Sequence, residues 1–149
     1  MIQKLSNDKN SVKKNKFQEL EEEANKNFKE GYLKKALEKY LVLQSYYSVN
    51  KDIEKETSIA KNLIKVYVSV ANEYLESNEK LKRNDNDLIK KAVYKLMDAI
   101  DISQKYRFDP TTDKLYKNAI KICSVYGLLN LKKEIEEQLR KNIENRIIK

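Results

Sequence analysis

The side chains that could do chemistry in this chain are few, and most are carboxylates. The chain has no histidine and a single cysteine, which excludes a Cys–His or Ser–His nucleophilic pair and a histidine-based metal site. Asp98 and Asp101 are three residues apart, a spacing that places an acid and a base on one face of a helix. The ordinary reading of such a pair, and of the run Glu21–Glu23, is a solvated helix face. Because the chain also lacks a glycine-rich phosphate loop, the sequence favours a protein that is not an enzyme.

The single cysteine, Cys123, leaves no intrachain disulfide and lies within an apolar helical pattern. That setting predicts a buried free thiol. No apolar run approaches the roughly 18–20 residues that a membrane span needs. The lysines near the N-terminus are not accompanied by the apolar core of a signal peptide. We therefore expect a cytoplasmic protein without a cofactor.

The net charge of +8 is unevenly spread along the chain. Residues 1–16 carry five lysines against Asp8 and have little apolar content, which predicts a flexible basic tail followed by a helical domain over residues 17–149. The mildly basic domain suits an acidic ligand. Binding of nucleic acid through the basic tail remains a lesser alternative, since acidic runs such as 21–23 interrupt any continuous basic stripe.

The composition and the spacing of apolar residues both predict an all-α fold. Two glycines and one proline are too few for the many turns of an all-β protein. Apolar residues recur at helical spacing in six segments. The first two segments cover about residues 17–30 and 32–49. The apolar residues of the other four run from Ile59 to Leu75, from Leu88 to Ile100, from Leu115 to Tyr126 and from Leu131 to Ile147.

The ends of the predicted helices carry recognisable signals. Asp52 and Asp87 are candidate N-caps, and Asp109 precedes Pro110, a residue type favoured in the first helical position. Gly31 and Gly127 each suit a turn at a helix C-terminus. Six helices then form three hairpins, of which the middle one turns on the polar segment 78–87. Hairpins cannot bury their apolar faces alone, so we expect them to stack.

Residues 20–43 resemble the tetratricopeptide repeat (TPR), a helix–turn–helix unit of about 34 residues. Small residues, a turn glycine and an aromatic occupy the expected positions, namely Ala24, Gly31, Ala36 and Tyr40. Two later repeats are degenerate: the second offers Ala92, Leu96 and Ala99, with Pro110 after it, and the third keeps Ala119 and Gly127 but has Lys132 where alanine is usual. The resemblance implies a right-handed α-solenoid of about three TPR-like hairpins.

The stretch "LEEEANKNFKEG" (20–31) is similar to the opening of co-chaperone TPR domains. In that family, Lys, Arg and Asn side chains clamp the carboxylates of a chaperone tail ending in Glu-Glu-Val-Asp. By position, the resemblance implies a peptide-binding set of Gln18, Asn25, Asn62, Lys114, Lys117, Asn118 and Lys121. Two positions depart from the family, with Glu21 in place of a lysine and Asn118 in place of an arginine. Lys117 and Lys121 lie close enough in sequence to compensate in part.

We therefore expect a protein–protein interaction module, or adaptor. It would hold a peptide or an extended partner segment, such as an acidic C-terminal tail, in the groove lined by the first helix of each hairpin. The alternative is a structural scaffold subunit of a larger multiprotein assembly. The degenerate repeats favour that alternative, as do Ile147 and Ile148, which end the last helix with no later element to cover them.

Overall fold

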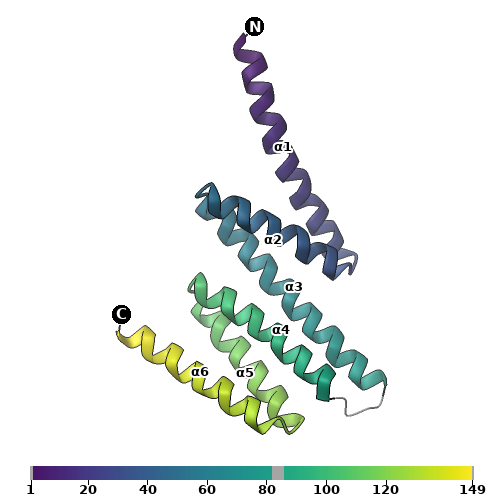
Figure 1. The fold of residues 1–149 in the computed structure, drawn as a ribbon, viewed down its shortest axis with the longest axis vertical. Coiled ribbons are helices and arrows are strands. Elements are labelled where there is room, and N and C mark those ends of the chain that lie inside the picture. Colours follow the sequence, from purple (N-terminus) through teal and green to yellow (C-terminus); the bar gives the residue numbers. More distant parts are fainter. Residues whose placement is uncertain (1, 82–85, 149) are drawn as a thin grey trace. The chain divides into compact units, whose positions relative to one another are not determined.

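The computed structural model describes residues 2–81 and 86–148, with side chains from residue 16 onward. The described residues form six α-helices and no strand, which confirms the predicted all-α class (Figure 1). The helices are α1 (Ile2–Lys29), α2 (Leu33–Val49), α3 (Ile53–Lys80), α4 (Asn86–Lys105), α5 (Asp109–Val125) and α6 (Leu129–Ile148).

The chain divides into two compact units, residues 1–66 and residues 67–149, and the boundary falls inside α3. In the N-terminal unit α1 packs against α2, and in the C-terminal unit α5 packs against both α4 and α6 (Figure 1). The first and last predicted hairpins are thus confirmed. The predicted turn of the middle hairpin includes residues 82–85, which lie outside the described residues, so this hairpin stays a prediction. Stacking into a solenoid stays a prediction.

The first helix is longer than the predicted segment 17–30, because α1 begins at Ile2. The sequence assigns residues 1–16 to a flexible tail on the basis of their charge and low apolar content. The side chains of residues 1–15 lie outside the described residues. The flexibility of this segment therefore stays a prediction.

The helix-start signals have mixed outcomes. Asp52 caps α3 as predicted, since its Oδ1 accepts the backbone N–H of Lys55 at 3.2 Å. Asp87 and Asp109 lie inside the first turns of α4 and α5 and do not precede them. The helices begin one or more residues earlier than the side-chain pattern suggests, so neither carboxylate occupies the capping position.

Four turns in the described chain share one backbone geometry. A residue with positive φ ends the helix in each, namely Gly31 (86°), Lys51 (55°), Arg107 (58°) and Gly127 (72°). The next residue donates its N–H to the carbonyl five positions earlier, as in Tyr32 to Asn27 (2.8 Å) and Leu128 to Cys123 (2.9 Å). This is the Schellman arrangement, and it confirms the predicted role of both glycines.

Lys51 and Arg107 hold a left-handed conformation that costs a residue with a Cβ roughly 1 kcal/mol. Replacing either by glycine is expected to raise the free energy of unfolding by about 0.5–1 kcal/mol, measured by urea denaturation. Gly31→Ala is the reverse change at an equivalent turn. The added Cβ would meet nothing within 4 Å, so the variant isolates the strain of the positive φ. Destabilisation by Lys51→Gly would contradict the assignment.

The turns repeat with a period of 76 residues, since Gly31 corresponds to Arg107 and Lys51 to Gly127. Buried side chains repeat with the same period: Tyr40 with Tyr116, Ala36 with Thr112, and Ile59 with Ile135. Each unit therefore contains the same helix–turn–helix–turn–helix pattern. This spacing differs from the predicted one, which aligned Ala36 with Ala92 and Lys132. The position equivalent to Ala36 holds threonine, so a search for small residues misses it.

The core is built as the sequence pattern indicates. Ala24 and Ala36 are fully buried on α1 and α2, in keeping with small residues that allow two helices to approach closely. Cys123 is a buried free thiol, as predicted, and burial raises its pKa. Ser103 and Thr112 are buried polar residues of the C-terminal unit, and their hydroxyl oxygens lie 2.7 Å apart in a hydrogen bond between α4 and α5.

Candidate functional site

One face of α5 carries four of the seven residues predicted to bind a peptide. Lys114, Lys117, Asn118 and Lys121 are all exposed, and we call them the α5 basic face. Their spacing of three and four residues places them on one side of the helix. The buried residues of α5 are Thr112, Leu115, Tyr116, Ala119 and Cys123. The helix thus separates a core-facing side from a basic side.

The positive charge of the α5 basic face is not compensated by the acids of the same helix. Asp113 lies four residues before Lys117, a spacing suited to an ion pair. Its two oxygens instead accept hydrogen bonds from the Arg146 guanidinium of α6, at 2.8 and 3.2 Å. Asp109 also lies 3.6 Å from Nε of Arg146. The three lysines therefore have no acidic partner among the described side chains.

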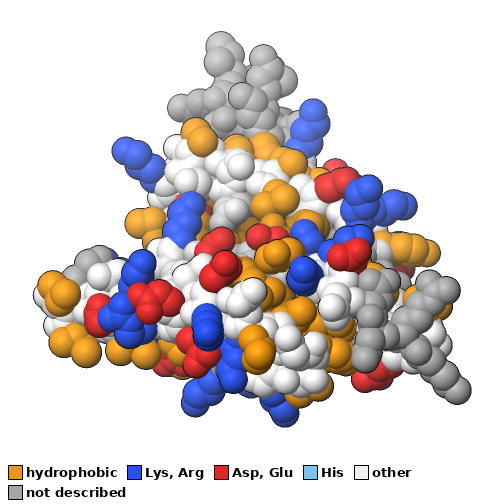
Figure 2. All heavy atoms as spheres, turned by 60° about the horizontal axis from the view of Figure 1, so that its bottom comes forward, with side chains coloured by type: hydrophobic (Ala, Val, Ile, Leu, Met, Phe, Trp, Pro, Cys, Tyr) orange, Lys and Arg blue, Asp and Glu red, His pale blue; other side chains and the backbone are white. Residues whose placement is uncertain are grey.

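The basic face ends next to exposed apolar side chains. Val125 lies one turn after Lys121 and is 67% exposed, and Leu129 lies across the Gly127 turn and is 63% exposed. Figure 2 shows, on the face that it draws, hydrophobic side chains reaching the surface among mixed basic and acidic ones. The C-terminal unit thus offers a cationic row on α5, with one exposed apolar side chain a turn beyond it and another just after the Gly127 turn.

The other three predicted residues belong to the N-terminal unit. Asn25 is exposed on α1, where its Oδ1 accepts a hydrogen bond from the Tyr40 hydroxyl. Gln18, also on α1, lines a cavity, and Asn62 is partly buried on α3. Action of these residues together with the α5 basic face, as a carboxylate clamp, stays a prediction.

The cavity in the N-terminal unit has a volume of about 420 Å³, and we call it the aromatic–acid cavity. It is lined by Phe17, Gln18, Glu21, Tyr46, Tyr47, Asn50, Asp52 and Lys55. The Phe17 and Tyr46 rings are stacked, with centroids 3.5 Å apart. Oε2 of Glu21, the residue at which the sequence departs from the co-chaperone pattern that it resembles, lies 4.0 Å from Nζ of Lys55. Sequence reasoning missed this cavity because its residues come from three segments.

The raised pKa values of three tyrosines predict that the fold loses stability at high pH. Burial, and then the negative charge of Glu21, raise the pKa values of Tyr40 and Tyr47 above 10, and burial does the same for Tyr116. The unfolded chain loses these protons at lower pH than the folded chain. The free energy of unfolding is therefore expected to fall as pH rises through 10 and beyond. Urea midpoints measured between pH 8 and pH 11 test this, and an unchanged midpoint would contradict it.

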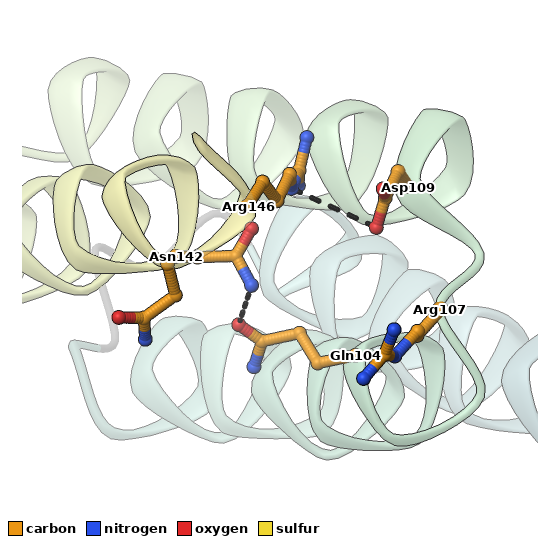
Figure 3. A pocket seen from close by; sticks show the side chains of 6 residues that line it. Gln104, Arg107, Asp109, Asn142 and Arg146 are labelled. Atoms are coloured by element: carbon orange, nitrogen blue, oxygen red, sulfur yellow. Dashed lines mark hydrogen bonds and ion pairs between the residues drawn. The ribbon is translucent and has the colours of Figure 1, made fainter. Parts of the chain in front are cut away.

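The C-terminal unit has a cavity of about 280 Å³ between α4, α5 and α6. Figure 3 shows Asn142 pointing toward Gln104, and Arg146 toward Asp109. Oε1 of Gln104 accepts hydrogen bonds from Nδ2 of Asn142 at 2.8 Å and from the Tyr116 hydroxyl at 2.9 Å. Two buried atoms, Oδ1 of Asn142 and Nε of Arg146, lack a hydrogen-bond partner among the described residues. These polar contacts tie the three helices together.

The carboxylates considered for acid–base chemistry lie on α4. Asp98 pairs with Lys95 at 3.5 Å, and burial, followed by the charge of Asp98, raises the pKa of Asp101. The described residues contain no group of three or more Cys, Asp and Glu side chains placed to hold a metal ion. Every helix in the described part of the chain is too short or too polar to cross a membrane.

Neither the protein-family models, nor the curated proteins, nor the solved structures give a significant match to the chain.

Proposed function

We propose that this chain is a non-catalytic protein-interaction module whose α5 basic face binds an acidic, extended segment of a partner protein. The observation that carries the proposal is the row of three exposed, uncompensated lysines leading to Val125 and Leu129. Ammonium groups form charge-assisted hydrogen bonds with carboxylates, and the apolar pair suits a neighbouring apolar side chain of the ligand. A tail such as Glu-Glu-Val-Asp has this combination of groups.

The same proposal assigns the helices to a right-handed, TPR-like α-solenoid. The Schellman turns at Gly31 and Gly127 support it, as does the complete burial of Ala24 and Ala36. In a solenoid of the hairpins α1–α2, α3–α4 and α5–α6, α5 would be a first helix and would line the groove, although the period of 76 residues makes it the equivalent of α2, the second helix of its hairpin.

The test is a binding titration with a fluorescent peptide ending in Glu-Glu-Val-Asp, and with a control peptide in which glutamine and asparagine replace the acids. Replacing Lys114, Lys117 and Lys121 by glutamine together is expected to weaken binding about tenfold or more, since each exposed ion pair contributes up to about 1 kcal/mol. Lys133→Gln, on α6, removes one exposed positive charge elsewhere in the same unit and should have little effect. Equal binding of both peptides would contradict the proposal.

A second candidate function is a scaffold subunit that buries its faces in a larger assembly. Ile143, Ile147 and Ile148 are exposed on α6, which favours this alternative. Native mass spectrometry of material isolated from its source separates the two. A stable complex of fixed composition would support the scaffold, and a free monomer would support the adaptor.

A further inference from the structure

The aromatic–acid cavity carries negative charge within a chain of net charge +8. Its lining includes two carboxylates, Glu21 and Asp52, and one amine, Lys55. The Glu21 side chain is only 20% exposed, yet its ion-pair distance to Lys55 is 4.0 Å, at the outer limit for such a contact. The Lys55 side chain is itself 53% exposed. The internal pair is therefore loose, and a cation from outside could replace Lys55.

Asp52 also has one carboxylate oxygen available to a ligand. One oxygen, Oδ1, caps α3 by accepting the Lys55 N–H. The other oxygen accepts no hydrogen bond from a described residue. The negative charges of both acids are felt inside the cavity. Burial raises the pKa of Tyr47, and the charges of Glu21 and Asp52 each raise it further.

Aromatic rings form the remaining wall. Phe17 of α1 stacks on Tyr46 of α2, and Tyr47 meets Tyr46 edge to face at 5.4 Å. The face of an aromatic ring attracts a cation, and a guanidinium plane stacks on such a face more readily than an ammonium group does. The cavity thus combines carboxylates with aromatic surface.

The C-terminal unit shows that the fold does not require this polar lining. At a spacing of 76 residues, Glu21 corresponds to Met97, Asp52 to Leu128 and Lys55 to Leu131. The equivalents of Phe17 and Tyr47 are Val93 and Cys123, which are fully buried, and Leu128 is buried as well. The same turn is therefore packed with apolar side chains in one unit and opens into a charged cavity in the other.

From this we infer that the aromatic–acid cavity binds a guanidinium group. A guanidinium is planar, always charged, and has five N–H donors that match carboxylate oxygens. The side chain of an arginine in a partner and free arginine present the same group. This site is in the N-terminal unit and does not depend on the α5 basic face.

The test is a chemical-shift titration of the ¹⁵N-labelled chain with three probes: N-acetyl-arginine N-methylamide, free arginine, and N-acetyl-citrulline N-methylamide. Citrulline has nearly the same shape as arginine but no charge. Saturable shifts of residues 17–21 and 46–55 with an arginine probe are expected. Tighter binding of the blocked amide would identify a partner's side chain, and tighter binding of free arginine a small-molecule ligand. Equal shifts with citrulline, or none with arginine, would overturn the inference.

Three variants of the cavity and one control variant on α6 sharpen the result. Glu21→Gln is expected to weaken arginine binding about tenfold or more. Asp52→Asn should weaken it while keeping the cap, because asparagine caps a helix as well as aspartate does. Lys55→Met removes the competing cation and should strengthen binding severalfold. Glu134→Gln, on α6, makes the same charge change elsewhere and should have no effect. Unchanged affinity in both Glu21→Gln and Asp52→Asn would refute the site.

Discussion

Replacing Tyr40 or Tyr116 by alanine is expected to lower the free energy of unfolding by about 3–5 kcal/mol, the usual cost of removing a buried aromatic side chain. The two tyrosines are 2% and 1% exposed and occupy equivalent positions in the two units. The loss is a large part of the roughly 5–15 kcal/mol that stabilises a typical domain. Urea denaturation followed by circular dichroism at 222 nm measures it.

The tyrosine hydroxyls contribute much less than the rings. Each bonds to an amide oxygen of the preceding helix, Asn25 for Tyr40 and Gln104 for Tyr116. Gln104 keeps a second donor, Asn142, when the Tyr116 hydroxyl is removed. Tyr116→Phe is therefore expected to cost no more than about 1 kcal/mol. A phenylalanine variant as unstable as the alanine variant would show that the hydrogen bond, and not packing, dominates.

The second large effect concerns Leu43 and Ala119, which are equivalent and fully buried but differ in size. At a second pair of equivalent positions the size difference is reversed: the N-terminal unit has Ala24 where the C-terminal unit has the larger Ile100. Leu43→Ala leaves a cavity and is expected to cost about 2–5 kcal/mol. Ala119→Leu adds volume to a filled core and is expected to cost about 1–3 kcal/mol.

Thermal and urea unfolding of both variants measure these losses. A matched control is Val42→Ala, which shortens an exposed apolar side chain of α2 next to Leu43 and should change stability by less than about 0.5 kcal/mol. A stabilised Ala119→Leu variant would contradict the account, since it would reveal unfilled space at a position that the structure shows as packed.

Local signals in the sequence predicted much of the fold. Helical periodicity located the six helices, and the positive φ that glycine tolerates marked the turns at Gly31 and Gly127. The buried thiol of Cys123 and the cap at Asp52 also follow from their immediate neighbours. Lys51 and Arg107 adopt the same turn without any glycine, so the sequence marked these two turns only through Asp52 and Pro110 and did not reveal their shared geometry or the period of 76 residues.

The candidate sites were less predictable, because they depend on contacts between helices. Only the structure shows that Arg146 binds Asp113, which leaves Lys117 without its intrahelical partner. From the sequence, Glu21 is only a departure from the co-chaperone pattern. The structure shows that it lines a cavity together with Asp52 and aromatic rings. Sequence spacing relates residues on one helix, whereas these groups come from several.

Mapping an acidic peptide onto the labelled chain tests the proposed function most directly. A ¹⁵N chemical-shift titration with a peptide ending in Glu-Glu-Val-Asp is expected to shift the amides of residues 114–129. The shifts should saturate and should weaken as salt is raised, because salt screens exposed charges. Shifts that avoid α5 altogether, or that persist unchanged in the Lys114, Lys117 and Lys121 triple glutamine variant, would contradict the account.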